Sequence, residues 1–424
     1  MPSYKFFVGL AVLAYLVAML VVRSRRPKIP VWSIMAFSAF AVVATALEPV
    51  DAISSAIDLN VILFLVGFFS VVGLAESSGL LDAIAYWVLS RARSLYGLLY
   101  ASSVLFGLMA AFMVNDTVAL MGPPIAYTMA RTAGVDPRAM FLLLAFSLTV
   151  GSAMTPMGNP QNMLIAIRSG MKAPLISFVS RLALPTAVNL LLTTYVIIKA
   201  YGIRNRPVSL LLIPHEAIRN RRDAALAGAG LVACVGGLVA NDALALAGLP
   251  HIAQRGFLPF MTAAAIYIFA SEPRKVLAHV DWGTIVFFMT MFITMDGVWR
   301  SGVVQAMLGL LHPAKMDGAL EFAAISASSI LLSQLLSNVP FVDVYIEYLK
   351  ALGYGGRDVA AWVTLAATST IAGNLTILGA ASNVIILEVL ESRYNTTITF
   401  TEFVKVGAVV TAVNTLVYSA FLVL

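Results

Sequence analysis

Apolar residues fill this chain in long unbroken stretches of about 17 to 25 residues, the length a helix needs to cross the hydrocarbon core of a bilayer. The stretches lack the alternation of a membrane β-strand, and only helices and closed barrels satisfy every backbone hydrogen bond in lipid. We therefore predict an all-α polytopic membrane protein. The pattern predicts about ten transmembrane helices, near residues 5–22, 31–47, 59–77, 139–168, 174–200, 224–246, 254–270, 282–298, 358–387 and 400–424.

Polar positions between these stretches recur at a constant spacing. Asn115 and Asn338 lie 223 residues apart (338 − 115 = 223), and Asp58 and Asp281 have the same offset (281 − 58 = 223). Ser78-Gly79 likewise matches Ser301-Gly302. Chance rarely holds one register over such a distance, so the sequence predicts an internal duplication.

The basic residues predict how the two copies are oriented. Loops rich in Lys and Arg usually face the cytoplasm. This rule places the loops at 23–28 and 204–222 inside, and the loop at 48–58, which has no Lys or Arg, outside. Basic loops flank both ends of residues 95–130, so we expect a re-entrant hairpin that enters from the cytoplasm. Its counterpart at 318–350 should enter from the outer face. An odd number of crossings then separates the copies and makes them inverted repeats, and both chain ends are predicted to lie outside.

Each hairpin turns through polar residues at membrane depth, where an unpaired polar group costs several kcal/mol. The first tip reads Asn115-Asp116-Thr117 and the second Ser337-Asn338-Val339. One interpretation is a turn that is capped by its own side chains. The other is an ion or substrate site, in which Asp116 binds a cation or carries a proton while Val339 cannot.

A second pair of motifs interrupts the apolar stretches that follow the hairpins. These segments share Thr, Gly and Asn at an offset of 221 residues (376 − 155 = 221), and prolines and glycines in them predict broken helices rather than a simple proline kink. Unwound backbone in a membrane must line a cavity or be buried, so its carbonyls can bind a cation and its new helix N-termini can face an anion. The candidate residues are Thr155, Pro156, Gly158, Asn159, Pro160 and Asn162, and Gly373, Asn374, Thr376, Gly379, Ser382 and Asn383.

Composition narrows the class of protein further. The chain has 60% hydrophobic and 11% charged residues with a mean hydropathy of +0.91. Its net charge of +6 lies in short loops and reports topology, so we expect no nucleic-acid partner. The single cysteine, Cys234, excludes a disulfide framework and a thiolate metal site. No enzymatic nucleophile with a base is evident, and the histidines are expected to be solvated in loops or at helix ends: His215, His251, His279 and His312.

The motifs resemble those of the ion transporter superfamily, and within it the arsenite permease group, which includes bacterial arsenical efflux permeases and plant silicon exporters. More distant relatives are dicarboxylate and citrate symporters and sodium/proton antiporters. The similarity covers about residues 30–424. The residues that carry it are Asn-Asp-Thr at 115–117, Thr-Pro-Met-Gly-Asn-Pro-Gln-Asn at 155–162, Ser-Asn-Val-Pro at 337–340 and Gly-Asn-Leu-Thr at 373–376.

The resemblance implies a sodium ion or proton near Asn115 and another near Asn338, with the substrate between them. It also implies a homodimer built on a scaffold domain, elevator-type movement of the transport domains, and for some members a separate ATPase subunit. The dicarboxylate symporters carry Ser-Asn-Thr in both tips. Here Asp116 and Val339 replace the threonines, which favours a small neutral polyhydroxy solute over a multivalent anion that the carboxylate would repel.

We therefore predict a secondary active transporter of an arsenite-like oxyacid or oxyanion in the plasma membrane. A sodium-coupled di- or tricarboxylate symporter and a sodium/proton antiporter are the alternatives. Asp343 and Asp296 are further candidates for ion coupling. The predicted parts are N-terminal scaffold helices at 1–56, repeat 1 at 57–200, a basic cytoplasmic linker at 201–223, connecting scaffold helices at 224–279 and repeat 2 at 280–424.

Overall fold

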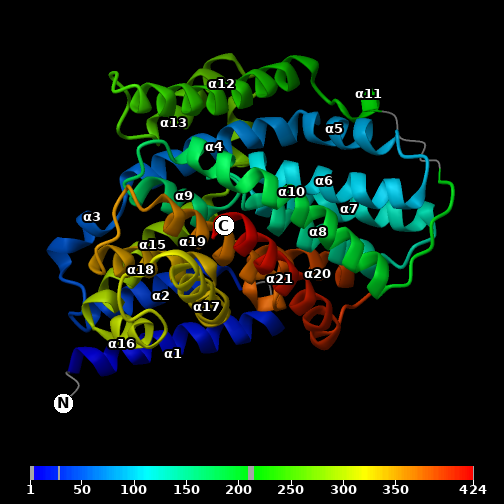
Figure 1. Cartoon of the computed structure of the whole chain (residues 1–424). Coiled ribbons are helices and arrows are strands. Elements are labelled where there is room, and N and C mark those ends of the chain that lie inside the picture. Colours follow the sequence, from blue (N-terminus) through cyan, green and yellow to red (C-terminus); the bar gives the residue numbers. More distant parts are fainter. Residues whose placement is uncertain (1–3, 27–28, 209–213, 424) are drawn as a thin grey trace.

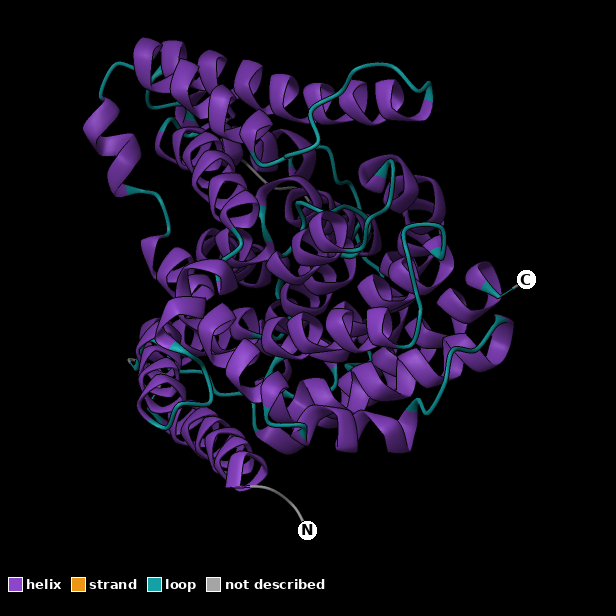
Figure 2. Cartoon of the chain, turned by 90° about the vertical axis from the view of Figure 1, so that its left-hand side faces the viewer, coloured by secondary structure: helices purple, strands orange, loops and turns teal. Residues whose placement is uncertain are grey.

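The structure is a computed structural model that describes residues 4–26, 29–208 and 214–423, and within these residues it contains helices and no β-strand (Figure 2). Helices bond their own backbone groups, so they can lie in lipid without unpaired amides. The all-α fold predicted from the apolar stretches is confirmed.

The duplication is visible in the helix boundaries. α4 (Leu59–Ser77) corresponds to α15 (Trp282–Arg300), and α6 (Leu95–Met113) corresponds to α17 (Gly318–Leu336). Both pairs begin and end at residues exactly one offset apart (282 − 59 = 223, 336 − 113 = 223). The register read from a few polar residues thus extends to whole helices.

The helices form a central group between two flanks (Figure 1). On one flank, α4 packs against α12 (Arg221–Leu246) and α13 (Phe257–Phe269). On the other flank, α15 packs against α2 (Val31–Ala44) and α1 (Tyr4–Arg25). Each copy therefore contributes its first long helix to a different flank. The shorter segments are η1 (Val50–Ala52), α3 (Ile53–Ala56), α5 (Leu80–Leu89), α11 (Pro214–Ala217), α14 (Pro273–Ala278) and α16 (Val303–Leu311).

The central group contains the two hairpins. In hairpin 1, α6 is followed by α7 (Asn115–Ala133), and in hairpin 2, α17 is followed by α18 (Asn338–Ala351). A single residue makes each turn, Val114 in one and Ser337 in the other, and both have φ of 66°. Non-glycine residues rarely adopt positive φ. The same unusual turn at equivalent positions places Asn115 and Asn338 at the first position of the returning helix.

The broken helices lie beside the hairpins. In repeat 1, α8 (Pro137–Ser152) and α9 (Pro160–Arg168) are separated by an unwound segment. In repeat 2, α19 (Val359–Ile371) and α20 (Ala381–Tyr394) are separated by two short 3₁₀ turns, η2 (Ala372–Asn374) and η3 (Ile377–Gly379). The central group is completed by two long antiparallel helices, α10 (Pro174–Ala200) and α21 (Phe400–Leu422).

The ten predicted spans coincide with α1, α2, α4, α10, α12, α13, α15, α21 and the two broken helices. Among the described residues, eight helices are long and apolar enough to cross a membrane, and two of these are the hairpin arms α6 and α17. Apolar length alone does not distinguish such an arm from a crossing. Conversely, α2 and α13 have 14 and 13 residues, and the broken helices fall below the length of a span because each is divided in two.

The basic linker holds the base of hairpin 1. The Leu95 amide donates to the Arg206 carbonyl at 2.8 Å, and the Tyr96 hydroxyl donates to the Ile203 carbonyl at 3.0 Å. The Arg206 guanidinium also donates to the carbonyls of Ala133 and Gly134 at the end of α7. The linker therefore ties together both arms of the hairpin. Residues 209–213 of the predicted linker lie outside the described residues.

Candidate functional site

One asparagine closes the unwound segment of repeat 1. The side-chain amide of Asn162 lies 3.2 Å from the Ser152 carbonyl, 3.3 Å from that of Ala153 and 3.3 Å from that of Thr155. The backbone amide of Asn162 donates to the Asn159 side chain at 2.9 Å, so Asn159 caps α9. These carbonyls lost their helical partners where α8 ends, and an unpaired buried carbonyl is costly. The side chain of Asn162 supplies part of the missing bonds. The Asn159 side chain also donates to the Ser152 carbonyl at 3.3 Å, and the Gly158 amide donates to the Thr155 carbonyl at 3.3 Å.

Repeat 2 uses the equivalent asparagine for the same purpose. The side-chain amide of Asn383 donates to the Gly373 carbonyl at 2.7 Å and to the Thr376 carbonyl at 3.3 Å. The three residues follow Asn162, Ser152 and Thr155 by 221 positions (383 − 162 = 221, 373 − 152 = 221, 376 − 155 = 221). The duplication thus includes the hydrogen bonds that stabilise the broken helices.

A threonine in each segment fastens it to the first arm of the adjacent hairpin. The Thr155 hydroxyl donates to the Ala111 carbonyl. The Thr376 hydroxyl donates to the Gln334 side chain at 2.7 Å, and that side chain in turn donates to the Ala372 carbonyl at 2.8 Å. Ala111 and Gln334 are equivalent (334 − 111 = 223). Each hairpin and the broken helix of the same repeat therefore form one unit.

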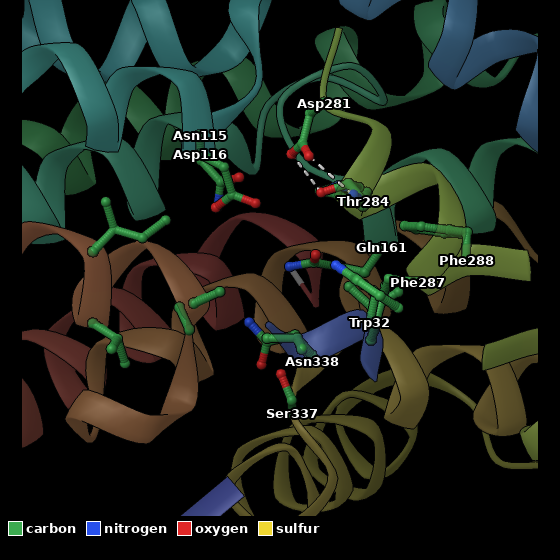
Figure 3. Close-up of a pocket in the computed structure, with 18 of the residues that line it drawn as sticks. Trp32, Asn115, Asp116, Gln161, Asp281, Thr284, Phe287, Phe288, Ser337 and Asn338 are labelled. Atoms are coloured by element: carbon green, nitrogen blue, oxygen red, sulfur yellow. Dashed lines mark hydrogen bonds between the residues drawn. The ribbon is translucent and has the colours of Figure 1, made fainter. Parts of the chain in front are cut away.

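The two tips face one another across a cavity of about 270 Å³ (Figure 3). Asn115 and Asp116 approach from hairpin 1, and Ser337 and Asn338 approach from hairpin 2, while Gln161 at the start of α9 lies between them. The apolar part of the wall comes from α1, α2, α7, α15, α18 and the second broken helix. It includes Trp32, Leu120, Phe287, Phe288, Leu378 and Val384.

The charged groups of the cavity are two carboxylates and one guanidinium, those of Asp116, Asp281 and Arg23. Asp281 caps α15, since it accepts from the Thr284 amide at 3.0 Å and from the Thr284 hydroxyl at 2.6 Å (Figure 3). The remaining polar lining is neutral amide and hydroxyl. Such a site has more negative than positive charge and many hydrogen-bonding groups, which suits a cation or a neutral hydroxylated solute better than a multivalent anion.

Several buried polar atoms around the tips have no protein partner. In repeat 2 they are Oδ1 of Asn338, both side-chain polar atoms of Asn374, Oγ of Ser382 and Oδ1 of Asn383. In the described part of repeat 1, Oδ1 of Asn115 is the only such unpartnered atom among the site residues predicted from the sequence. Buried polar atoms normally bond to protein or to ordered water, so these oxygens are available to a water molecule, an ion or a solute.

The predicted site residues occupy two shells around the cavity. Asn115, Asp116, Pro160, Ser337, Asn338 and Val339 line it. A second set, buried or half-buried behind that lining, carries the supporting segments: Thr117, Thr155, Pro156, Gly158, Asn159, Asn162, Gly373, Asn374, Thr376, Gly379, Ser382 and Asn383.

Asp343 and Asp296 lie elsewhere. Asp343 forms an ion pair with Arg168 at 2.7 Å, and Asp296 forms one with Arg300 at 2.8 Å. Both carboxylates line a separate cavity of about 200 Å³ next to α3 rather than the cavity between the tips.

Sequence reasoning missed part of the lining. Gln161 lies inside the Gly-Asn-Pro-Gln-Asn run and corresponds to Ser382 in repeat 2 (382 − 161 = 221), a shorter side chain that does not line the cavity. Asp281 served only to align the copies, and Trp32 and Arg23 come from helices outside the repeats. Asp281 could have been recognised as a site residue, because it is polar, recurs in both copies and stands at the start of a helix.

The prediction that all four histidines are solvated is wrong for His312. Its side chain is fully buried, and its ring nitrogens lie 2.8 Å from the Tyr345 hydroxyl and 3.2 Å from the Tyr354 hydroxyl. The loop after α16 folds back onto α18, and these tyrosines satisfy the ring. The position near a helix end did not reveal this packing.

Two inverted repeats with re-entrant tips around a shared cavity define a membrane transporter. A family model described as citrate transporter matches residues 7–372. Because the match spans most of the chain, the protein belongs to this citrate transporter family, which confirms the predicted superfamily.

The curated relatives are also transporters or membrane proteins. An uncharacterised transporter of Mycobacterium tuberculosis is 27% identical over 376 residues, covering 84% of each chain. The silicon efflux transporter LSI3 of Oryza sativa is 26% identical over 401 residues, covering 80% of each chain. The inner membrane protein YbiR of Escherichia coli is 25% identical over 298 residues, covering 70% of this chain and 73% of the relative.

Among solved structures, the YdaH transporter of Alcanivorax borkumensis has a similar fold. Its TM-score is 0.56 with 12% sequence identity, over 99% of this chain and 98% of that one. At this identity the likeness concerns the fold alone, and it extends over the full length of both chains.

We predict that Asn162→Ala destabilises the protein and abolishes transport. The substitution removes a donor from three buried carbonyls and leaves that of Ala153 without one, which costs about 1–3 kcal/mol, and so should lower Tm by several degrees. Thermal unfolding in detergent measures the effect. Gln305→Ala is the control, because it removes a single bond to the Trp299 carbonyl away from the site. Equal Tm values for the two variants would contradict the bridging role of Asn162.

Proposed function

We propose that the protein is a secondary active transporter of a small hydroxylated inorganic solute, an arsenite-like oxyacid or oxyanion, coupled to protons or sodium. The observation that carries the proposal is the cavity between the hairpin tips, in which Asp116 and Asp281 face a single guanidinium, that of Arg23. A trivalent anion would meet two like charges in a site of low dielectric constant. An uncharged oxyacid would not.

The neutral part of the lining suits such a solute. Carboxamides of Asn115, Gln161 and Asn338 and the hydroxyl of Ser337 surround the cavity, and amides and hydroxyls can both donate and accept. A volume of about 270 Å³ accommodates a molecule with a few oxygen atoms and some water. The name of the rice relative, a silicon efflux transporter, supports the same substrate class, since silicic acid is a neutral hydroxylated solute.

The free oxygens of repeat 2 suit the coupling ion. Asn338, Asn374, Ser382 and Asn383 supply neutral oxygens around the second tip, and hard cations prefer oxygen ligands. These residues would hold a sodium ion, whose charge favours binding of an oxyanion beside it. In repeat 1, Asp116 adds an ionisable group that can carry a proton or bind a cation. The two half-sites would thus differ in their coupling chemistry.

A sodium-coupled di- or tricarboxylate symporter is the second candidate. The description of the family, citrate transporter, favours it, and Arg23 in the lining could pair with one carboxylate of such a substrate. A sodium/proton antiporter is the third candidate. In that case both half-sites would bind only cations, and no solute would bind between them. Competition experiments separate these candidates by the ligand that binds.

The remaining proposals follow from the resemblance. They are a homodimer in the plasma membrane, with the flanking helices as scaffold and the central group as the part that moves, and a separate ATPase subunit as an additional partner. The layering supports this division, because α4 and α15 pack into opposite flanks while the hairpins and broken helices pack on one another.

We predict that the purified protein is stabilised by arsenite or silicate more than by phosphate, sulfate or citrate. A ligand that binds the folded state raises stability by about 2.7 kcal/mol at a hundredfold excess over its Kd. Thermal shifts with each compound, with and without sodium and at two pH values, measure this. Stabilisation by citrate that requires sodium, with none by arsenite or silicate, would support the symporter instead.

We predict that Asp116→Asn uncouples transport from the ion gradient. An ion that moves with the solute across 100 mV contributes about 2.3 kcal/mol, so uncoupling should lower gradient-driven accumulation by more than about tenfold. Arsenite and silicate uptake into proteoliposomes with imposed pH or sodium gradients measures this. Asp51→Asn, at an exposed position of the 3₁₀ segment η1, is the control. If Asp116→Asn kept full uptake and its pH dependence, the carboxylate would have no coupling role.

A further inference from the structure

Arg168, at the end of α9, lies where the central group meets both flanks. Its guanidinium donates to Asp343 of α18 at 2.7 Å and to Asp58, the cap of α4, at 3.1 Å. It also lies 4.7 Å from the ring centroid of Phe292 in α15. The Arg168 side chain is 18% exposed and that of Asp343 is 6% exposed. Charges removed this far from water persist only when they are paired, so the cluster holds these four helices together.

The cluster occupies the predicted outer end of the molecule. Arg168 and Asp343 line the cavity of about 200 Å³ that is bounded by Ser55 and Ala56 of α3, in the loop predicted to lie outside. The cavity between the tips extends the other way. Its lining includes Leu20, Arg23, Val31 and Trp32 at the turn between α1 and α2, which is predicted to be cytoplasmic.

The repeat register shows what stands at the equivalent place on the cytoplasmic side. Asp58 corresponds to Asp281 (281 − 58 = 223), Asp343 corresponds to Leu120 (343 − 120 = 223), and Arg168 corresponds to Val389 (389 − 168 = 221). Leu and Val cannot form the ion pair. Instead, Asp281 and Leu120 both line the cavity between the tips.

We propose that Arg168 is a positioning residue that keeps the predicted outer side closed in this conformation, in which the cavity between the tips faces the predicted cytoplasmic side. While Asp58 holds Arg168, α9 and α18 stay against α4, and the tips are accessible from the cytoplasm. Release of Asp58 lets the central group move and opens the outer side. The neighbouring cavity allows water to replace Asp58, because it already reaches the guanidinium. The predicted cytoplasmic side has no equivalent ion-pair cluster, and it is the side on which the cavity is accessible.

The inference rests on the alternating-access part of the proposed function, not on its substrate or coupling ion. It can be tested without substrate by labelling from outside. The sole cysteine is removed by Cys234→Ser, and Leu378→Cys places a thiol in the wall of the cavity between the tips. A membrane-impermeant maleimide added to right-side-out vesicles then reacts only when the cavity opens outward.

We expect Asp58→Asn and Arg168→Gln each to raise the labelling rate about tenfold over the parent, which corresponds to about 1.4 kcal/mol in the equilibrium between the two states. Asn caps helices as well as Asp does, so Asp58→Asn should keep the bonds to Asn60 and Val61 that start α4. If Arg168→Gln does not fold, the labelling rate of Asp58→Asn alone tests the proposal. Arg168→Lys keeps the charge but offers one nitrogen in place of the two that bond Asp58 and Asp343, so it should label at a rate between those of the parent and Arg168→Gln.

Lys315→Gln is the matched control, because it breaks an ion pair of 2.7 Å with Asp358 that does not reach α4. If the parent is labelled and Asp58→Asn and Arg168→Gln react at the rate of Lys315→Gln, the positioning role of Arg168 is wrong while alternating access stands. If no variant is ever labelled from outside, alternating access and the inference fall together.

Discussion

A helix that breaks inside a bilayer must find new partners for the carbonyls it frees, because lipid offers none. In this chain two side-chain amides do so, those of Asn162 and Asn383, each across the gap between two half-helices. The threonines of the same segments then attach the hairpins. These asparagines therefore help to hold the tips in place, together with the bond from the Asn115 amide to the Gly158 carbonyl, and unwound backbone can persist at membrane depth.

The two copies share this support but not the chemistry it presents. Repeat 1 carries Asp116 at its tip, and among its predicted site residues only Asn115 has an unpartnered oxygen, whereas repeat 2 leaves oxygens of Asn338, Ser382 and Asn383 without partners. The ends of the molecule differ as well, since Asp58 is paired with Arg168 while Asp281 lines the cavity. Equal scaffolds with unequal charges allow one half to bind an ion and the other to respond to it, and give the two sides of the membrane different contacts.

Much of this architecture could be predicted because duplication turns a weak local signal into a repeated one. Asn115 and Asn338 located both tips, and the Thr, Gly and Asn residues at the second offset located both broken helices. The residues that could not be predicted have no repeat partner of the same kind. Gln161, Arg23 and Arg168 depend on which helices pack together. Gly79 and Gly302 do recur in the two copies, with φ of 80° and 82°, but a glycine alone did not show that a new helix, α5 or α16, begins there.

The central claim is that one cavity between two inverted half-sites is exposed alternately to the two sides of the membrane. Counterflow tests it most directly. Proteoliposomes are loaded with unlabelled arsenite or silicate and diluted into a trace of labelled solute without any ion gradient. We predict a transient accumulation of label above its equilibrium level, because the returning carrier brings labelled solute inward. Smooth equilibration without an overshoot would contradict alternating access and indicate a channel.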